Sequence, residues 1–425
     1  MGGASLSAMA SLLAAGLLLA ASSPAGARVS FTDGGHGFGR MGPRNARTTS
    51  VDPATGPDFE MPFVCGQVWT GTTRASHSPS PYAVDFNTPN DLGKPALASA
   101  PGVVTQAVTL TGSYGRFVVV DHGGGYSTLY AHLNAIAATV GTYLDQGDLV
   151  GYVGGSGNVT GPHLHFEERK DGAYFPPYFH RTRYVFGTTS ASGNCGDRPV
   201  VGDWTGDGRA DVGVVHSAPS TGQFRELRDG VTRGFRWGTP DEIPLAGDWD
   251  GNGRSDVGSR AFGTSVVSLR SGSGGRTDVP VGLASDTPVS GDWDGDHHTD
   301  LGYYRGSTHS FGLRAADGSV TSVPWGQAGS RPVTGDWNHD GRTDVGVFDP
   351  ATATWSLRVV RPHGVVTRTV AFGSPGDVPV TGDWNGDGVT DLGTWTPASA
   401  TFTRRTPGAS PGVYETSTVV YGSPR

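Results

Sequence analysis

The sequence has 425 residues, of which 16% are charged, and a formal net charge of −8. This length leaves room for two to four domains, so one activity need not account for the whole chain. Lysine occurs only at Lys94 and Lys170, and no basic stretch is dense enough to follow a phosphate backbone, which argues against a nucleic acid partner.

Glycine is abundant, with 68 residues, and runs rich in Val and Thr are interrupted by Gly, Asp, Asn and Pro. Such runs are typical of strands joined by tight turns. No long segment has the 3.6-residue period of an amphipathic helix. The composition therefore predicts an all-β protein.

Residues 1–27 have the pattern of a secretory signal peptide, although the usual basic start is missing. Residues 12–21 form an apolar Ala/Leu run that is too short to span a bilayer, and residues 25–27 are small, as at a cleavage site. Residues 28–60 are rich in Gly, Arg and Pro and contain His36, which predicts a disordered leader or a removable pro-segment. We therefore expect a secreted, extracellular protein without a membrane span.

Cys65 and Cys195 are the only cysteines of the chain. Export to an oxidising compartment favours a disulfide between them over the alternative, two unpaired buried thiols. A bridge at these positions would join the two ends of one domain, which we place at residues 61–196.

Four segments between the cysteines have the composition of strands, at residues 82–86, 116–121, 127–132 and 163–167. Polar residues occur in them in a way that a core would not require. Asp85 lies inside an otherwise apolar strand and therefore needs a partner.

Five residues of this region are candidates for a metal-dependent active site. Two imidazoles and one carboxylate form a hydrolytic zinc site whose fourth position is open for water. We predict His77, Asp85 and His165 as the ligands of one zinc ion. His163 and His132 remain to act as the base and to stabilise the developing negative charge, and the sequence leaves open which residue does which.

Two nearby residues have alternative interpretations. Asp91 is the alternative carboxylate ligand to Asp85. His122 lies in an Asp-His-Gly-Gly turn, and a histidine bonded to the backbone is the favoured interpretation for it.

His77, Asp85, the Tyr-Ala-His-Leu segment at His132 and the motif Gly-Pro-His-Leu-His-Phe-Glu together resemble the lysostaphin-type zinc endopeptidases. The resemblance covers about residues 62–195. The spacing of eight positions from His77 to Asp85 resembles the β-lytic branch of that family. It implies zinc binding by the three predicted ligands, catalysis by the other two histidines, and hydrolysis of peptide cross-links of bacterial peptidoglycan, including glycine-containing bonds. The alternative is a non-catalytic cell-surface adhesin or regulator that uses the hydrolase fold as a scaffold.

The C-terminal half repeats itself, with Gly-Asp-Trp triplets that recur at intervals of 44 to 47 residues. The triplets begin at Gly202, Gly247, Gly291, Gly335 and Gly382. Each interval holds about four short strands, the size of a β-propeller blade. An aromatic-Gly step precedes three of the later triplets and recurs at Tyr421, near the end of the chain. We therefore predict a five-bladed β-propeller at residues 197–425 whose last strand completes the first blade; a partial propeller or a linear array is the alternative.

Each triplet opens a loop with oxygen-bearing side chains at every second position and again at the ninth, a spacing that suits calcium. The predicted calcium ligands are Asp203, Asp207, Asp211, Asp248, Asp250, Asn252, Asp256, Asp292, Asp294, Asp296, Asp300, Asp336, Asn338, Asp340, Asp344, Asp383, Asn385, Asp387 and Asp391. The first loop has Thr205 at its third position, and the third has His297 in place of a glycine. We expect these two loops to be the weakest or least regular.

The repeats resemble the FG-GAP or VCBS-type repeats of calcium-bearing β-propellers in secreted and cell-surface proteins. The resemblance implies up to five calcium ions and a propeller that positions the enzyme on a surface or polymer. By analogy, its partner would be a cell-wall polymer or a carbohydrate. We expect a monomer.

Overall fold

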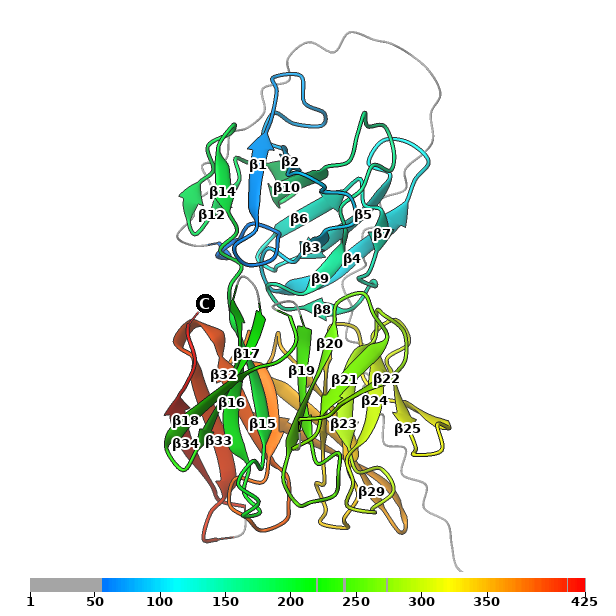
Figure 1. The fold of residues 1–425 in the computed structure, drawn as a ribbon, viewed down its shortest axis with the longest axis vertical. Coiled ribbons are helices and arrows are strands. Elements are labelled where there is room, and N and C mark those ends of the chain that lie inside the picture. Colours follow the sequence, from blue (N-terminus) through cyan, green and yellow to red (C-terminus); the bar gives the residue numbers. More distant parts are fainter. Residues whose placement is uncertain (1–55, 219–220, 240–241, 273, 411, 425) are drawn as a thin grey trace, which may run out of the picture. The chain divides into compact units, whose positions relative to one another are not determined.

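A computed structural model of the chain describes residues 56–218, 221–239, 242–272, 274–410 and 412–424 (Figure 1). Across these ranges the elements are strands, apart from one 3-10 turn (η1, Pro397–Ser399), which confirms the all-β prediction. No helix in the described part of the chain is long and apolar enough to cross a membrane. The predicted signal peptide and residues 28–55 of the predicted leader lie outside the described residues.

The N-terminal part is built on one large antiparallel sheet, shown in blue to green in Figure 1. Its strand order is β14 (Thr189–Ala191), β1 (Val68–Thr72), β2 (Val84–Asn87), β10 (Leu164–Lys170), β6 (Tyr126–Ala131), β5 (Arg116–Asp121), β4 (Gly102–Thr109) and β8 (Tyr143–Leu144), with β11 (Ala173–Tyr174) beside β10. A second sheet has the order β3 (Pro95–Leu97), β9 (Leu149–Tyr152) and β7 (Ala135–Ile136), and β12 (Tyr178–Phe179) pairs with β13 (Thr182–Arg183). The four strands expected from the sequence are therefore β2, β5, β6 and β10.

The core of this part is aromatic and closely packed on the large sheet. Phe63 stacks on Trp69 with ring centroids 3.8 Å apart, and Phe86 meets Phe63 edge to face. Tyr130 and Phe166 are also fully buried in the same cluster. Because Phe86 and Phe166 come from β2 and β10, the strands that carry Asp85 and His165, packing fixes the backbone beneath the candidate site.

Cys65 and Cys195 form a disulfide, as predicted, and close a segment of 130 residues. Residues 56–60, the end of the predicted leader, lie within the part of the chain that the structure describes. Phe59 is 3% exposed and belongs to the aromatic core, and Glu60 is also buried. Burial of the Phe59 ring favours attachment of this segment. Backbone hydrogen bonds from Glu60 N–H to the carbonyl of Ser99 and from His180 N–H to the carbonyl of Phe59 also hold it.

The C-terminal part consists of five four-stranded antiparallel sheets, each formed by consecutive strands. The first three are β15 (Asp197–Gly202), β16 (Asp211–Ala218), β17 (Thr221–Arg228) and β18 (Val231–Arg236); β19 (Glu242–Gly247), β20 (Asp256–Ala261), β21 (Val266–Arg270) and β22 (Arg276–Pro280); and β23 (Thr287–Gly291), β24 (Asp300–Arg305), β25 (Ser310–Arg314) and β26 (Val320–Pro324). The other two are β27 (Arg331–Gly335), β28 (Asp344–Asp349), β29 (Thr354–Arg361) and β30 (Gly364–Ala371); and β31 (Val378–Gly382), β32 (Asp391–Thr396), β33 (Thr401–Pro407) and β34 (Tyr414–Val420).

The first strands of successive sheets lie next to one another, and β31 of the fifth sheet also contacts β15 of the first. The same repeat positions of all five strands line one shared hollow. Hydrogen bonds also join consecutive loops: for example, the backbone N–H of Asp248 donates to Thr299 Oγ1 at 2.9 Å in the next repeat. The five sheets are therefore linked in a cyclic order through their first strands.

The expectation that the last strand completes the first sheet is wrong. β34 pairs with β33 of its own sheet, and the first sheet already has four strands of its own. Instead, the backbone N–H of Ser423 donates to Asp197 Oδ2 at 2.6 Å, which ties the end of the chain to the first sheet. The spacing of the aromatic-Gly steps placed the chain end correctly but did not distinguish a strand from a side-chain contact.

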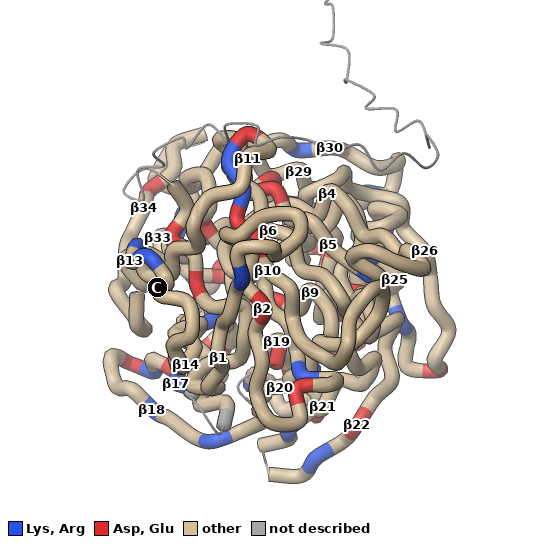
Figure 2. Tube along the Cα trace, turned by 90° about the horizontal axis from the view of Figure 1, so that it is seen from above, with Lys and Arg blue, Asp and Glu red and all other residues tan. Residues whose placement is uncertain are grey.

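Charged residues are spread over the trace, and Figure 2 shows Lys and Arg separated by long uncharged stretches. The acidic residues of the repeats are concentrated in the loops between the first and second strand of each sheet.

Candidate metal centre

The candidate ligands meet where β1, β2 and β10 lie side by side. Asp85 of β2 is the direct cross-strand partner of His165 of β10, so their side chains leave the same face of the sheet. His77 comes from the loop between β1 and β2. The sheet register alone therefore brings together two segments that are 80 residues apart in sequence.

Three side chains converge on one point. Asp85 Oδ1 lies 3.1 Å from His77 Nε2 and 3.1 Å from His165 Nδ1. One ligand atom from each residue lies within 4.8 Å of the others. The predicted ligands His77, Asp85 and His165 are thus brought together, and they offer two nitrogens and one oxygen.

The other ring nitrogen of each histidine is held by a hydrogen bond that fixes the orientation of the ring. His77 Nδ1 lies 3.1 Å from the carbonyl of Ala83, and His165 Nε2 lies 2.9 Å from Glu167 Oε1. A ring nitrogen that donates to such an acceptor carries the proton, so the opposite nitrogen presents its lone pair. His77 Nε2 and His165 Nδ1 are therefore the nitrogens directed at the common point.

Glu167 is the centre of a buried network behind His165. It is 1% exposed and accepts hydrogen bonds from Tyr114 Oη at 2.7 Å and from Arg169 Nε at 2.7 Å. Burial alone would raise the pKa of Glu167, but the bonds from His165 and the charge of Arg169 outweigh burial and lower it. Glu167 is therefore an anion that holds His165 in place.

Burial and the neighbouring polar groups also oppose each other in setting the pKa values of the candidate ligands. Burial would raise the pKa of Asp85, yet hydrogen bonds from His165 and His77 hold this pKa well below its ordinary value. Burial would lower the pKa of His165, but the carboxylates of Asp85 and Glu167 raise it. The site is therefore organised around a permanently ionised carboxylate.

His132 and His163 form the second half of the site, with ring centroids 4.9 Å apart. His132 Nδ1 lies 2.9 Å from the carbonyl of Ser156, and His163 Nδ1 lies 3.0 Å from the carbonyl of Gly161. The Nε2 atoms are left for the site, and that of His163 lies 3.5 Å from Asp85 Oδ1. Burial lowers the pKa of His132 to about 4, so its imidazole is neutral near pH 7.

His132 follows β6 with a φ of 61°, a left-handed conformation that is costly for a residue with a Cβ. Its backbone N–H donates to the carbonyl of Tyr114, and its carbonyl accepts from Ser156, at 2.9 and 3.3 Å. These bonds hold the strained residue so that its ring turns toward the other histidines.

A cavity of about 620 Å³ opens over these five side chains. Its wall includes His77, Asp85, His132, His163 and His165, together with Tyr114, Arg74, Asn87, Asn158 and Thr160. Polar groups therefore line much of this cavity.

The alternative residues lie elsewhere. Both ring nitrogens of His122 are bonded, to the carbonyl of Pro101 and to Thr128 Oγ1, each at 2.8 Å, in agreement with the structural interpretation of this residue. Asp91 is absent from the cavity wall and from the ligand cluster, so the geometry favours Asp85.

The network of Tyr114, Glu167 and Arg169 was not predicted from the sequence. Glu167 belongs to the Gly-Pro-His-Leu-His-Phe-Glu motif, two residues after His165 and therefore on the same face of the strand. That two-residue spacing was the sequence signal that could have predicted a contact between Glu167 and His165. Tyr114 comes from a loop, and its approach to Glu167 depends on tertiary structure.

The segment that carries most of this site matches a known family model. Residues 80–177 match Peptidase family M23. The match includes Asp85, His132, His163 and His165, and His77 lies three residues before it.

Curated relatives align over the same segment. The chain is 43% identical over 89 residues to the DD-carboxypeptidase/endopeptidase Mpg of Neisseria meningitidis, covering 21% of this chain and 20% of the relative. It is 42% identical over 84 residues to the peptidoglycan DD-endopeptidase ShyA of Vibrio cholerae, covering 20% of this chain and 19% of the relative. The chain thus spans about a fifth of the length of these curated relatives.

Among solved structures, the chain is 25% identical to a zinc-containing peptidase from Vibrio cholerae. That alignment covers 31% of this chain and 41% of the other, with a TM-score of 0.26.

Proposed function

We propose that the protein is a secreted zinc metalloendopeptidase that hydrolyses peptide cross-links of bacterial peptidoglycan, including glycine-containing bonds. Residues 56–196 would form the catalytic domain, and residues 197–425 a second domain. The observation that carries the proposal is the convergence of His77, Asp85 and His165 within 4.8 Å, in and beside the segment that matches the peptidase family.

The donor set fits zinc. Two imidazole nitrogens and one carboxylate oxygen are the ligands of hydrolytic zinc sites, and a carboxylate behind one histidine is the usual outer partner. His77 Nε2, Asp85 and His165 Nδ1 would hold the ion, and Glu167 supplies the outer carboxylate. When bound, zinc would supply a Lewis acid that polarises the scissile amide carbonyl.

The two remaining histidines would move protons and balance charge. The neutral His132 would accept a proton at Nε2 from the attacking water, because its Nδ1 proton is engaged with Ser156. His163 would donate an Nε2–H to the developing negative charge when its ring carries both protons, because its Nδ1 is engaged with the carbonyl of Gly161.

Dye-labelled peptidoglycan tests this function directly. The purified full chain is expected to release soluble label, to lose this activity when zinc is removed with a chelator, and to regain it with zinc. The variant His165→Ala should be inactive, whereas His363→Ala, which changes an exposed histidine in the turn after β29, should remain active. Full activity of zinc-free protein would refute the proposal.

The five sheets are best explained as a five-bladed β-propeller. Their cyclic order, the shared hollow along the first strands and the contact of Ser423 with Asp197 support this interpretation. The propeller would hold the catalytic domain on a surface or polymer.

Calcium would stabilise the loops between the first two strands of each blade. In each loop the first aspartate accepts backbone hydrogen bonds from the turn, as Asp203 does from Gly206 and Gly208. The ninth-position carboxyl is buried beside other carboxylates, which raises its pKa, for example to about 7 in Asp391. The Oδ2 atoms of Asp256 and Asp344 are buried and have no hydrogen-bond partner among the described residues, as expected if a cation is their partner.

The first and third loops, which contain Thr205 and His297, keep the shape of the other loops. His297 has a φ of 68°, close to the 79° of Gly253 at the same position, so the turn is retained at a cost in strain. In the same loop, Asp292, Asp294 and Asp300 bring carboxylate oxygens within 4.8 Å of one another. Thr205 donates to Asp203 Oδ1 at 3.2 Å. Weaker calcium binding by these two loops stays a prediction.

Calcium binding predicts a rise in the thermal unfolding midpoint when calcium is added to chelated protein, because a ligand that binds the folded state stabilises it. The rise should shrink in Asp344→Asn, which removes one ninth-position carboxylate. It should be unchanged in Asp317→Asn, which alters an exposed carboxylate in the turn between β25 and β26. No shift at saturating calcium would contradict the assignment.

A further inference from the structure

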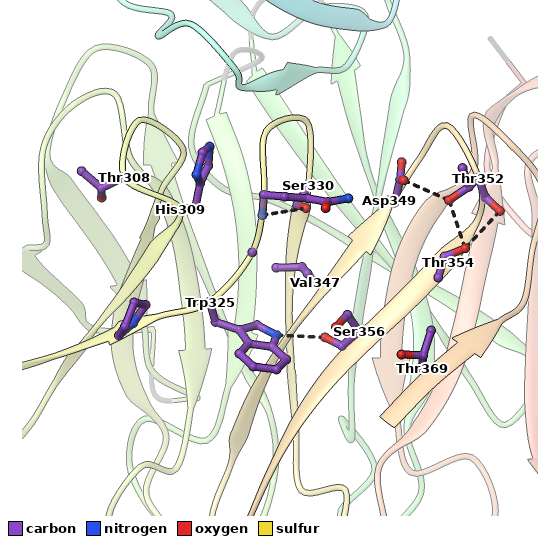
Figure 3. A pocket seen from close by; sticks show the side chains of 13 residues that line it. Thr308, His309, Trp325, Ser330, Val347, Asp349, Thr352, Thr354, Ser356 and Thr369 are labelled. Atoms are coloured by element: carbon purple, nitrogen blue, oxygen red, sulfur yellow. Dashed lines mark hydrogen bonds between the residues drawn. The ribbon is translucent and has the colours of Figure 1, made fainter. Parts of the chain in front are cut away.

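A second cavity, of about 660 Å³, lies between the third and fourth sheets of the C-terminal part (Figure 3). Small-molecule sites range from about 300 to 1,000 Å³, so this cavity has the size of a ligand site. It is formed by the turn before β25, the segment from β26 to β27, and strands β28, β29 and β30.

The repeats explain why a cavity exists at this position. In the other four sheets the position at or just before the start of the first strand is acidic: Asp197, Glu242, Asp286 and Asp377. In three of these sheets the carboxylate bonds a side chain at the end of the second strand: Asp197 with His216, Asp286 with Arg305 at 2.7 Å, and Asp377 with Thr396 at 2.8 Å. The carboxylate also accepts a hydrogen bond from the backbone N–H of the residue after a hydrophobic-residue-and-glycine pair. For example, Asp377 accepts from Ser374, which follows Phe372 and Gly373, at 2.8 Å.

The fourth sheet reverses this arrangement. Ser330 occupies the acidic position, and Asp349 lies at the end of the second strand, where the other sheets have His216, Ala261, Arg305 and Thr396. Ser330 Oγ accepts the N–H of Gln327 at 3.3 Å, so the small hydroxyl retains the local backbone bond but leaves space. Asp349 is half-buried and bonded to Thr352 Oγ1 and to the N–H of Ala351, each at 2.9 Å.

The wall of this cavity combines an aromatic ring with neutral polar groups. Trp325 is half-buried, and its Nε1 donates to the carbonyl of Ser356 at 3.0 Å, so the ring itself remains as an apolar surface. Figure 3 shows the Trp325 ring below His309 and Ser330. Asp349, Thr352 and Thr354 lie to the right of Trp325 in the same view. The hydroxyl-bearing residues of the wall are Thr308, Ser330, Thr352, Thr354, Ser356 and Thr369. Among the described residues that line it, none is Lys or Arg.

We propose that this cavity binds a neutral saccharide. The C–H face of a sugar ring packs on the negative face of an indole, and hydroxyl side chains both donate to and accept from sugar hydroxyls. Asp349 accepts hydrogen bonds strongly and repels an anionic sugar, and no Lys or Arg among the described lining residues offsets that repulsion. The inference rests on the proposed polymer-binding role of residues 197–425 and assigns it to one site.

Titration calorimetry of the full chain tests this site with three disaccharides: chitobiose, which is built from N-acetylglucosamine, cellobiose, and the anionic digalacturonate. Binding of chitobiose or cellobiose is expected, and the comparison shows whether an acetamido group is required. Trp325→Ala should weaken binding about tenfold or more, as the loss of a central aromatic contact does. Phe372→Ala, at the same repeat position before the fifth sheet, is the matched control and should bind normally.

The decisive variant is the double substitution Ser330→Asp with Asp349→Thr, which recreates the Asp377–Thr396 pair of the fifth sheet. It should fold normally, as judged by its thermal unfolding midpoint, and should no longer bind the disaccharide. Thr354→Val, which removes one hydroxyl, provides a milder second variant with weaker binding expected. The proposal would be overturned if neither chitobiose nor cellobiose binds, or if digalacturonate binds more tightly than both. It would also be overturned if a folded double variant binds the disaccharide as tightly as the wild type. Peptidase activity of the double variant should be unchanged on soluble peptides, which separates this test from that of the catalytic domain.

Discussion

Replacement of Glu167 by glutamine should disturb the candidate metal centre without touching a ligand. The carboxylate accepts bonds from His165 Nε2, Tyr114 Oη and Arg169 Nε at 2.7 to 2.9 Å and is 1% exposed. An amide loses the charge, and one of its two ends must place N–H groups against a donor. Loss of a buried charge-assisted pair costs about 3–5 kcal/mol, and the partial exposure of Arg169 lowers our expectation to about 2–3 kcal/mol.

The next residue on the strand is a matched control. Glu168 is also 1% exposed, but it faces the opposite side of β10, and among the described residues its carboxyl group accepts the N–H of Tyr178, at 3.1 Å. Burial raises the pKa of Glu168 well above its ordinary value, which favours its neutral form. Glu168→Gln should therefore cost less than about 1 kcal/mol, as a near-isosteric exchange of neutral groups does.

Urea unfolding of both variants measures the stability difference, and competition with a chromogenic chelator measures the affinity for zinc. We expect Glu167→Gln to bind zinc about 10- to 100-fold more weakly, since it loses the carboxylate that orients His165. Equal free energies of unfolding for the two variants would refute the assignment of charge to Glu167. Reduced stability with unchanged zinc affinity would refute the positioning role alone.

Three further predictions concern the same domain. Removal of the Cys65–Cys195 disulfide by a double alanine substitution should lower the free energy of unfolding by up to about 5 kcal/mol, because a closed loop of 130 residues is released; an unchanged denaturation midpoint would contradict this. Burial raises the pKa of Glu60 to about 8, so the folded chain retains a proton that the unfolded chain has lost, and stability falls as pH rises toward 8. The stability gained by Glu60→Gln relative to wild type should therefore grow between pH 5 and 8 in unfolding titrations, and a constant difference would count against it. Gly154→Ala would place a Cβ 2.3 Å from the backbone nitrogen of Asn134, and circular dichroism melts should show a lower midpoint; a wild-type melt would exclude this clash.

The sequence was sufficient to predict the parts of the structure that depend on local pattern. Strand-like composition located β2 and β10, and the two-residue period of a strand places His163 and His165 toward one side. The disulfide followed from having only two cysteines in a chain with a signal-like start. Five repeats predicted five units, and each forms one four-stranded sheet.

Features that depend on distant contacts were not predictable. The approach of Tyr114 to Glu167 joins residues 53 positions apart, and no periodicity encodes it. Phe59 lies in a polar stretch whose composition indicates disorder, yet burial of its ring and the backbone hydrogen bonds of Phe59 and Glu60 attach that stretch to the core. The exchange of Ser330 and Asp349 is visible in the aligned repeats, but its consequence, an open cavity, required the structure.

Mass spectrometry of the products released from defined peptidoglycan tests the central claim most directly. The wild-type chain loaded with zinc is expected to yield fragments with new amino and carboxyl termini at peptide cross-links, while the glycan strands stay intact. His165→Ala, prepared in the same way, should yield none of these fragments. Cleavage of glycan bonds, or the same peptide fragments from His165→Ala, would contradict a zinc endopeptidase centred on His77, Asp85 and His165.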